Sequence, residues 1–137
     1  MHALTIINIA FATLLIAACS KSPTDKLVGE WKGTDSTGST ASVMLGADHT
    51  FRMVMGNSVL DGPTLGGKLE WRLDATHDPM ALDVIAKKSS GEQRVIPMIV
   101  RFITDQKLQL RFSVDMQSRP ASFSVDETRD QIIVTKQ

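Results

Sequence analysis

The chain has 137 residues, one cysteine, and 15 basic against 15 acidic side chains. This balanced charge argues against nucleic acid or an anionic surface as a partner selected by bulk charge. A single cysteine excludes an intramolecular disulfide, so a folded domain of this chain must be held together by its core.

The first predicted element is an apolar segment from Ala3 to Ala18 that has no charged side chain. It is too short to span a hydrocarbon core of about 30 Å comfortably, and small residues end it, as is typical of a secretory signal. We therefore expect residues 1–18 to be a signal peptide. An ordinary cleaved signal with an incidental cysteine is the alternative.

This segment ends in the sequence IAAC, Ile16 to Cys19, which resembles the lipobox of bacterial lipoproteins. The resemblance implies that Cys19 is lipidated and anchors the protein in a membrane, with acyl chains that each contribute about 0.8 kcal/mol per buried CH₂. It further implies a cell-envelope location, and Ser20 after the cysteine favours the outer membrane, facing the periplasm. We expect residues 19–25 to be the lipidated cysteine with a short tether, and residues 26–137 to be one domain.

The rest of the chain alternates apolar and polar residues with period two. In the segment KLEWRLD, for example, Leu69, Trp71 and Leu73 alternate with charged side chains, as in a strand with one buried face. No stretch predicts a convincing amphipathic helix. The predicted strands are residues 27–34, 41–45, 50–55, 68–74, 80–87, 94–104, 107–115, 121–125 and 131–136, and turn-rich sequences separate them.

Short connections between strands favour antiparallel neighbours. We therefore expect an all-β fold, a small antiparallel up-and-down barrel of about eight strands, because a barrel leaves no long exposed edges. A β-sandwich is the alternative.

Several short motifs, in order, resemble a bacterial lipocalin-like (calycin-type) domain family. The first is LVGEWKG, which holds Gly29 and Trp31, and it is followed by GKLEWRLDATHDPMALDVIA, ITDQKLQLRF and SRPASF. The resemblance implies that Trp31 closes the floor of the barrel. It also implies that Arg119 or Arg111 packs across the Trp31 ring as a cation–π pair.

Candidate catalytic residues are few. His49 and His77 lie in turn-like sequences beside Asp48 and Asp78, and neither has a metal-ligand spacing. Polar turn residues are the simpler interpretation, since acid–base catalysis needs a positioned substrate or nucleophile. The chain also lacks the common nucleophile, phosphate-loop and dinucleotide motifs. We expect no enzyme activity and no cofactor.

Met53 and Met55 share one face of a predicted strand with Phe51. Two thioethers at this spacing resemble a copper(I) site, because soft sulfur suits a soft ion. The neighbouring Phe51 favours the alternative, in which methionine fills irregular core space. We therefore expect no metal site.

The longest irregular stretch, Gly56 to Gly67, contains the apolar residues Val59, Leu60 and Leu65. They are candidates to line the mouth of a barrel, to contact a partner, or to fold back over the core. The resemblance and the expected interior favour non-catalytic binding of a small apolar ligand or lipid. The alternative is a module that binds a protein partner, as an inhibitor or an accessory subunit of an envelope complex.

Overall fold

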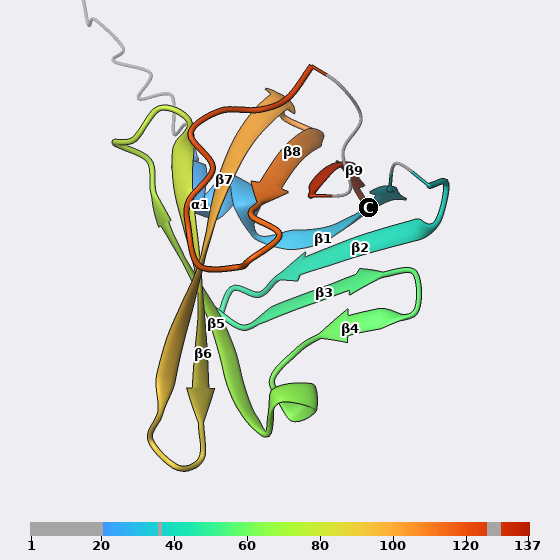
Figure 1. Ribbon diagram of the computed structural model, residues 1–137. Helices are drawn as coiled ribbons and strands as arrows, with labels where there is room; N and C mark the ends of the chain where they lie inside the picture. The colour runs from blue at the N-terminus through green and yellow to red at the C-terminus, as the bar shows by residue number, and fades with distance from the viewer. Residues whose placement is uncertain (1–20, 36, 126–129) are drawn as a thin grey trace, which may run out of the picture.

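The computed structural model describes residues 21–35, 37–125 and 130–137 (Figure 1). In this part of the chain nine strands form one sheet, with a short α-helix before it and a 3₁₀ turn within it. The elements are α1 (Pro23–Leu27), β1 (Gly29–Thr34), β2 (Thr40–Leu45), β3 (Phe51–Met55), β4 (Ser58–Leu60), η1 (Pro63–Leu65), β5 (Gly67–Asp74), β6 (Met80–Lys88), β7 (Gln93–Thr104), β8 (Lys107–Phe112) and β9 (Gln131–Lys136).

The sheet is an antiparallel meander that curls strongly on itself. Its strand order is β4-β3-β2-β1-β9-β8-β7-β6-β5, so β1 pairs with β9 and the gap falls between β4 and β5 (Figure 1). The predicted all-β, barrel-like fold is confirmed, and one continuous sheet rules out the two separate sheets of a sandwich.

The gap between β4 and β5 is bridged at one end only. Thr50, just before β3, forms an isolated bridge with Glu70 of β5, and the amide of Trp71 donates to the carbonyl of His49 at 2.9 Å. Further toward the other end, β4 and β5 do not pair, and the chain that connects them forms the 3₁₀ turn η1. The barrel is therefore closed at one end and open along its seam at the other.

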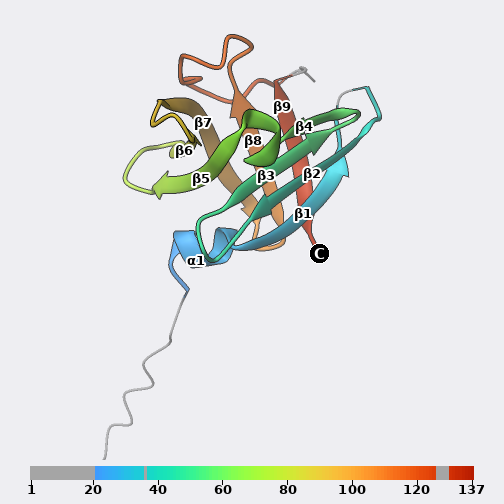
Figure 2. The ribbon, with the colours of Figure 1, turned by 90° about the horizontal axis from the view of Figure 1, so that it is seen from below.

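We call these two ends the closed end and the mouth. The closed end carries α1 and the β2–β3, β5–β6 and β7–β8 turns, whereas the mouth carries the β1–β2, β3–β4 and β6–β7 turns and the segment that follows β8. Figure 2 shows α1 at one end of the sheet and the β1–β2 turn at the other.

The short helix α1 covers the closed end. Pro23 lies in its first turn, and the Ser22 hydroxyl accepts a hydrogen bond from the Asp25 amide at 3.2 Å, which caps the helix. Its last residue, Leu27, is fully buried, and its carbonyl accepts a hydrogen bond from the Trp31 indole at 2.9 Å. The expected tether of residues 19–25 thus contributes its last residues to this cap. Five residues are too few to produce a periodic helical signal.

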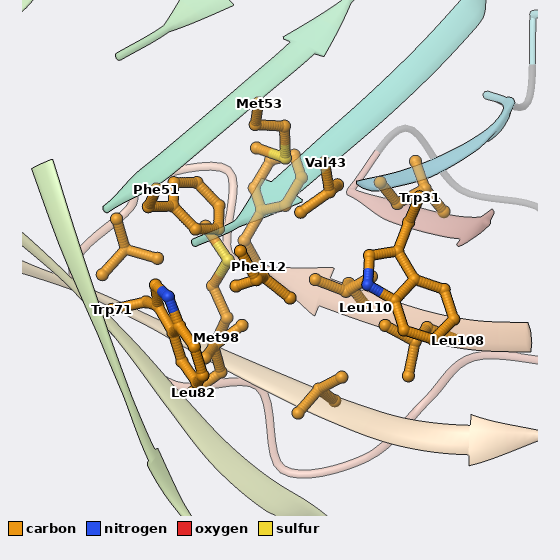
Figure 3. Close-up of a cluster of buried hydrophobic side chains, with 14 of the residues drawn as sticks. Trp31, Val43, Phe51, Met53, Trp71, Leu82, Met98, Leu108, Leu110 and Phe112 are labelled. Atoms are coloured by element: carbon orange, nitrogen blue, oxygen red, sulfur yellow. The ribbon is translucent and has the colours of Figure 1, made fainter. Parts of the chain in front are cut away.

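The closed half of the barrel is filled by side chains. Both tryptophans, Trp31 and Trp71, are buried there, and in Figure 3 they lie among leucines, Phe51 and Met98. This core comes from alternate residues of successive strands, as the period-two pattern predicts. A deep open cup is therefore absent from the described part of the barrel.

Near the C-terminus, the strand predicted at residues 107–115 is too long, and the strand predicted at residues 121–125 does not form. Strand β8 ends at Phe112, and Val114 is 84% exposed. Residues 121–125 are irregular because side chains bind their backbone: the Ser122 carbonyl accepts from Arg111, and Ser124 exchanges hydrogen bonds with the Gln131 amide group.

Residues 113–125, which we call the crossing segment, first pass the mouth and then, from Arg119 onward, run over the outer face of β6, β7 and β8 (Figure 1). Arg119 in this segment forms an ion pair with Asp83 of β6 and donates to the carbonyl of Met98 of β7. Arg101 of β7 stacks on Phe123, 4.5 Å from the ring centroid. Contacts of arginine side chains, rather than the hydrogen bonds of a strand, therefore hold this segment against the barrel.

Candidate functional site

The mouth contains two adjoining apolar pockets inside the curled sheet. Their volumes are about 240 Å³ and about 180 Å³, and both walls include Leu60 and Met116. The other walls of the first pocket are Leu65, Ala86, Lys88, Glu92, Arg94 and Ile96. Those of the second are Met53, Met55, Ser58, Val59 and Phe112.

Strands β3, β6 and β7 build the floor of the mouth. Met53 and Met55 lie two residues apart on β3, and Ala86 of β6 and Ile96 of β7 lie on the core-facing sides of their strands. Their side chains continue the buried rows that fill the closed half. The pockets are thus the unfilled upper end of the barrel interior.

The connection from β4 to β5 supplies the wall at the gap in the sheet. Leu65 sits at the end of η1, where its amide donates to the carbonyls of Asp61 and Gly62. Gly66 then turns the chain with φ of 69°, and a Cβ atom at Gly67 would meet the carbonyl oxygen of Lys87. This tight turn presents Leu60 and Leu65 to the same pocket.

Met116 enters the mouth from the crossing segment. Its backbone has φ of 54°, in the left-handed region that methionine rarely adopts. The turn is stabilised by Asp115, whose carboxylate accepts from the amides of Gln117 and Ser118 at 2.9 and 3.3 Å. These hydrogen bonds lower the pKa of Asp115. The turn fixes Met116 between the two pockets.

Charged side chains form the rim of the first pocket on the β6–β7 hairpin. Lys88 and Glu92 are paired at 3.3 Å, and Arg94 lies opposite Ala86 in the register of β6 and β7. In the part of the chain that the structure describes, Arg94 has no ion-pair partner. The mouth is therefore apolar inside and carries a free cation at its edge.

Sequence reasoning found part of this site. Val59, Leu60 and Leu65 all lie in its walls, although β4 was not predicted as a strand. Met116 and Arg94 were missed. Met116 lies in a turn sequence without periodicity, whereas Arg94 stands two residues before Ile96 and could have been placed on the inner face by alternation.

Gly29 and Trp31, which the lipocalin-like resemblance assigns to the floor of the barrel, lie at the closed end, apart from the mouth. Trp31 is fully buried there, and the cation over its ring is Lys136, with Nζ 5.2 Å from the ring centroid. The expectation for Arg119 or Arg111 is corrected, because both are engaged on the outer face: Arg119 with Asp83, and Arg111 with Asp130 at 3.3 Å. Lys136 reaches the ring because β9 pairs with β1 at Trp31.

The structure also shows where the two candidate histidines lie. His49 Nδ1 lies 3.1 Å from the Trp71 carbonyl oxygen, and His77 Nε2 lies 3.6 Å from Asp74 in a turn at the closed end. Neither histidine lines the mouth. No group of three or more His, Cys, Asp or Glu side chains suited to a metal ion occurs among the described residues.

Two much larger hollows lie away from the mouth in the described part of the chain. One, of about 600 Å³ beside β3 and β5, is lined by charged groups such as Arg52 and Asp61, which are paired at 3.4 Å. Hydrogen bonds from Thr64 lower the pKa of Asp61. The other, of about 810 Å³, lies along the crossing segment. A larger share of their walls is polar than in the two pockets of the mouth, which makes the mouth the better candidate for an apolar ligand.

Comparisons of the chain with protein-family models, with curated proteins and with solved structures find no match. Within the described residues, no helix has the length and apolar character needed to cross a membrane. The predicted signal peptide and Cys19 lie outside the described residues.

Proposed function

We propose that this protein is a lipocalin-like, non-catalytic binding protein that takes a small apolar ligand, or the apolar part of a lipid, into its mouth. The observation that carries this proposal is the pair of adjoining apolar pockets at the unfilled end of an otherwise packed barrel. Burying one methylene group there contributes about 0.8 kcal/mol. The small volumes favour a short chain or a single ring over a bulky ligand.

We further propose that the protein is anchored to the outer membrane through lipid on Cys19 and faces the periplasm. The described chain enters the fold through Lys21 and Ser22 at the closed end, next to α1 (Figure 2). An anchor that precedes these residues would leave the mouth on the far side of the barrel, open to the aqueous phase.

The six methionines after the signal segment provide a direct test of the binding proposal. The test uses residues 21–137, which contain every strand and core residue described, with ¹³C-labelled methionine methyl groups. Titration with 1-octanol should shift the methyl resonances of Met53, Met55 and Met116, which line the mouth. Those of Met44, on an outer hollow, and Met80, at the closed end, should stay in place.

Leu60→Gln should weaken octanol binding about tenfold, because it places an amide group in the wall that both pockets share. Val114→Gln is the matched control, since Val114 is 84% exposed and lines neither pocket. Shifts confined to Met44 or Met80, or equal binding by both variants, would overturn the proposal.

The anchor is tested by Cys19→Ser in the full chain. The parent protein should incorporate labelled palmitate and fractionate with membranes, and the variant should do neither. A parent that incorporates no palmitate, with a variant that still fractionates with membranes, would contradict lipidation.

A protein-binding module is the second candidate function. Val59 is 37% exposed on the short strand β4, whose outer edge pairs with no strand in the described part of the chain. The filled closed half also limits the ligand volume. Photo-crosslinking from position 59 in cells should then give one discrete product that is absent from position 114, and the absence of such a product would count against a partner at this edge.

A further inference from the structure

We infer that the ligand of the mouth is amphipathic, with an anionic head group that Arg94 binds at the rim. This inference rests on the proposed function, because it specifies the polar end of a ligand whose apolar part occupies the pockets. It adds the chemical class of the head group and names the residue that selects it.

The first support is the position of the cations on the strands. Alternate residues of a strand share a face, so Lys88 continues the core-facing row of Val84 and Ala86 on β6. On β7, Arg94 begins the row that continues through Ile96. The inner surface thus changes from apolar to cationic at the point where the mouth meets solvent.

The second support is the charge balance at this rim. The wall of the first pocket carries Lys88, Glu92 and Arg94. Glu92 is paired with Lys88 at 3.3 Å, which leaves the Arg94 charge uncompensated among the described residues. A guanidinium group binds a carboxylate or phosphate oxygen through charge-assisted hydrogen bonds.

The remaining acidic groups that the structure describes at this end are engaged elsewhere. Asp35 accepts hydrogen bonds within the β1–β2 turn, Asp115 accepts them within the crossing segment, Asp61 pairs with Arg52, and Asp130 pairs with Arg111. None of these carboxylates lies in the wall of the first pocket. Among the described residues, Glu92 is therefore the one acidic side chain in the wall beside Arg94, and Lys88 already pairs with it.

Three probes with the same eight-carbon chain test the inference: octanoate, 1-octanol and octyltrimethylammonium. Octanoate should bind residues 21–137 more tightly than octyltrimethylammonium does, and its advantage should shrink at high salt, because the rim is exposed to solvent. Arg94→Gln should weaken octanoate binding about fivefold and leave octanol binding unchanged. Arg94→Glu should reverse the preference between the two charged probes.

Arg72→Gln is the matched control, because Arg72 is an exposed arginine of β5 that lines neither pocket of the mouth. If all three probes bind the parent protein and Arg94→Gln leaves octanoate binding unchanged, the head-group inference is wrong and the proposed function stands. Tighter binding of octyltrimethylammonium also overturns the inference. If none of the probes shifts the mouth methionines, the proposed function itself fails.

Discussion

At the scale of single residues, Trp31 shows how the closed end is built. Its ring is fully buried, its indole nitrogen donates to the Leu27 carbonyl of α1, and Lys136 of β9 lies over its face. One side chain therefore joins the helix, the first strand and the last strand.

Trp31→Ala should lower the free energy of unfolding by about 3–5 kcal/mol, as for other buried aromatic truncations. Urea denaturation followed by circular dichroism measures the change. Val114→Ala, at an exposed position, should stay within about 0.5 kcal/mol of the parent protein. A loss below about 1 kcal/mol for Trp31→Ala would show that the ring does not close the core.

The position of Trp31 could be predicted from the sequence, whereas its cation partner could not. The G-x-W motif and the alternation around it indicate a buried ring in the first strand. The choice of Lys136 depends on the pairing of β1 with β9, which brings together residues 105 positions apart in the chain. Local pattern contains no information about such a register.

At the scale of elements, the closure between β1 and β9 depends on a close approach of two backbones. Gly33 faces Val134 in the register, and a Cβ atom at Gly33 would meet the carbonyl oxygen of Ile133. Only glycine permits this spacing, because any side chain would force the two strands apart.

Gly33→Ala should therefore destabilise the fold by about 1–3 kcal/mol, in the range of other overpacked sites. Thermal or urea unfolding provides the measurement, with Thr34→Ala on the same strand as a control that should cost less than about 1 kcal/mol. Equal stability of the two variants would mean that the strands separate at this point without a penalty.

The elements also show where local propensity was overridden. Residues 121–125 carry a strand-like pattern, but Arg111 and Gln131 satisfy backbone groups that a neighbouring strand would otherwise bind. Strand β4 arises in a turn-rich sequence because the β3–β4 turn brings it beside β3. In both cases contacts with a neighbouring element, rather than the periodic pattern of the segment itself, decided the conformation.

At the scale of the whole molecule, aspartates close turns at both ends of the barrel. Threonine hydroxyl groups two or three residues further on lower the pKa of Asp35, Asp48, Asp61 and Asp74, and backbone amides lower that of Asp115. The charged form is therefore favoured in the folded state. Because these hydrogen bonds favour the charged carboxylates, they make the free energy of unfolding depend on pH.

Because the folded pKa values lie below the ordinary aspartate value of about 3.9, their contribution is complete above that pH and is lost as the pH falls through the lower folded values. The urea midpoint should thus decrease as the pH falls from about 4 to about 2. A variant with Asn in place of all five aspartates keeps a hydrogen-bond acceptor at each turn but has no titrating charge there. Its urea midpoint should decrease less over this pH range. An equally steep decrease in that variant would assign the acid sensitivity to other groups.

The sequence by itself determined the all-β class, the bounds of most strands to within one or two residues, and the apolar character of the loop before β5. It could do so because period-two alternation is a local signal. Only the tertiary structure decided where the interior stays unfilled, since Leu60, Leu65, Arg94 and Met116 meet only when the sheet curls and its seam opens between β4 and β5. The shape of the mouth depends on the strand register, which pairs residues far apart in the chain, and on the left-handed backbone at Met116, which no periodic pattern signals.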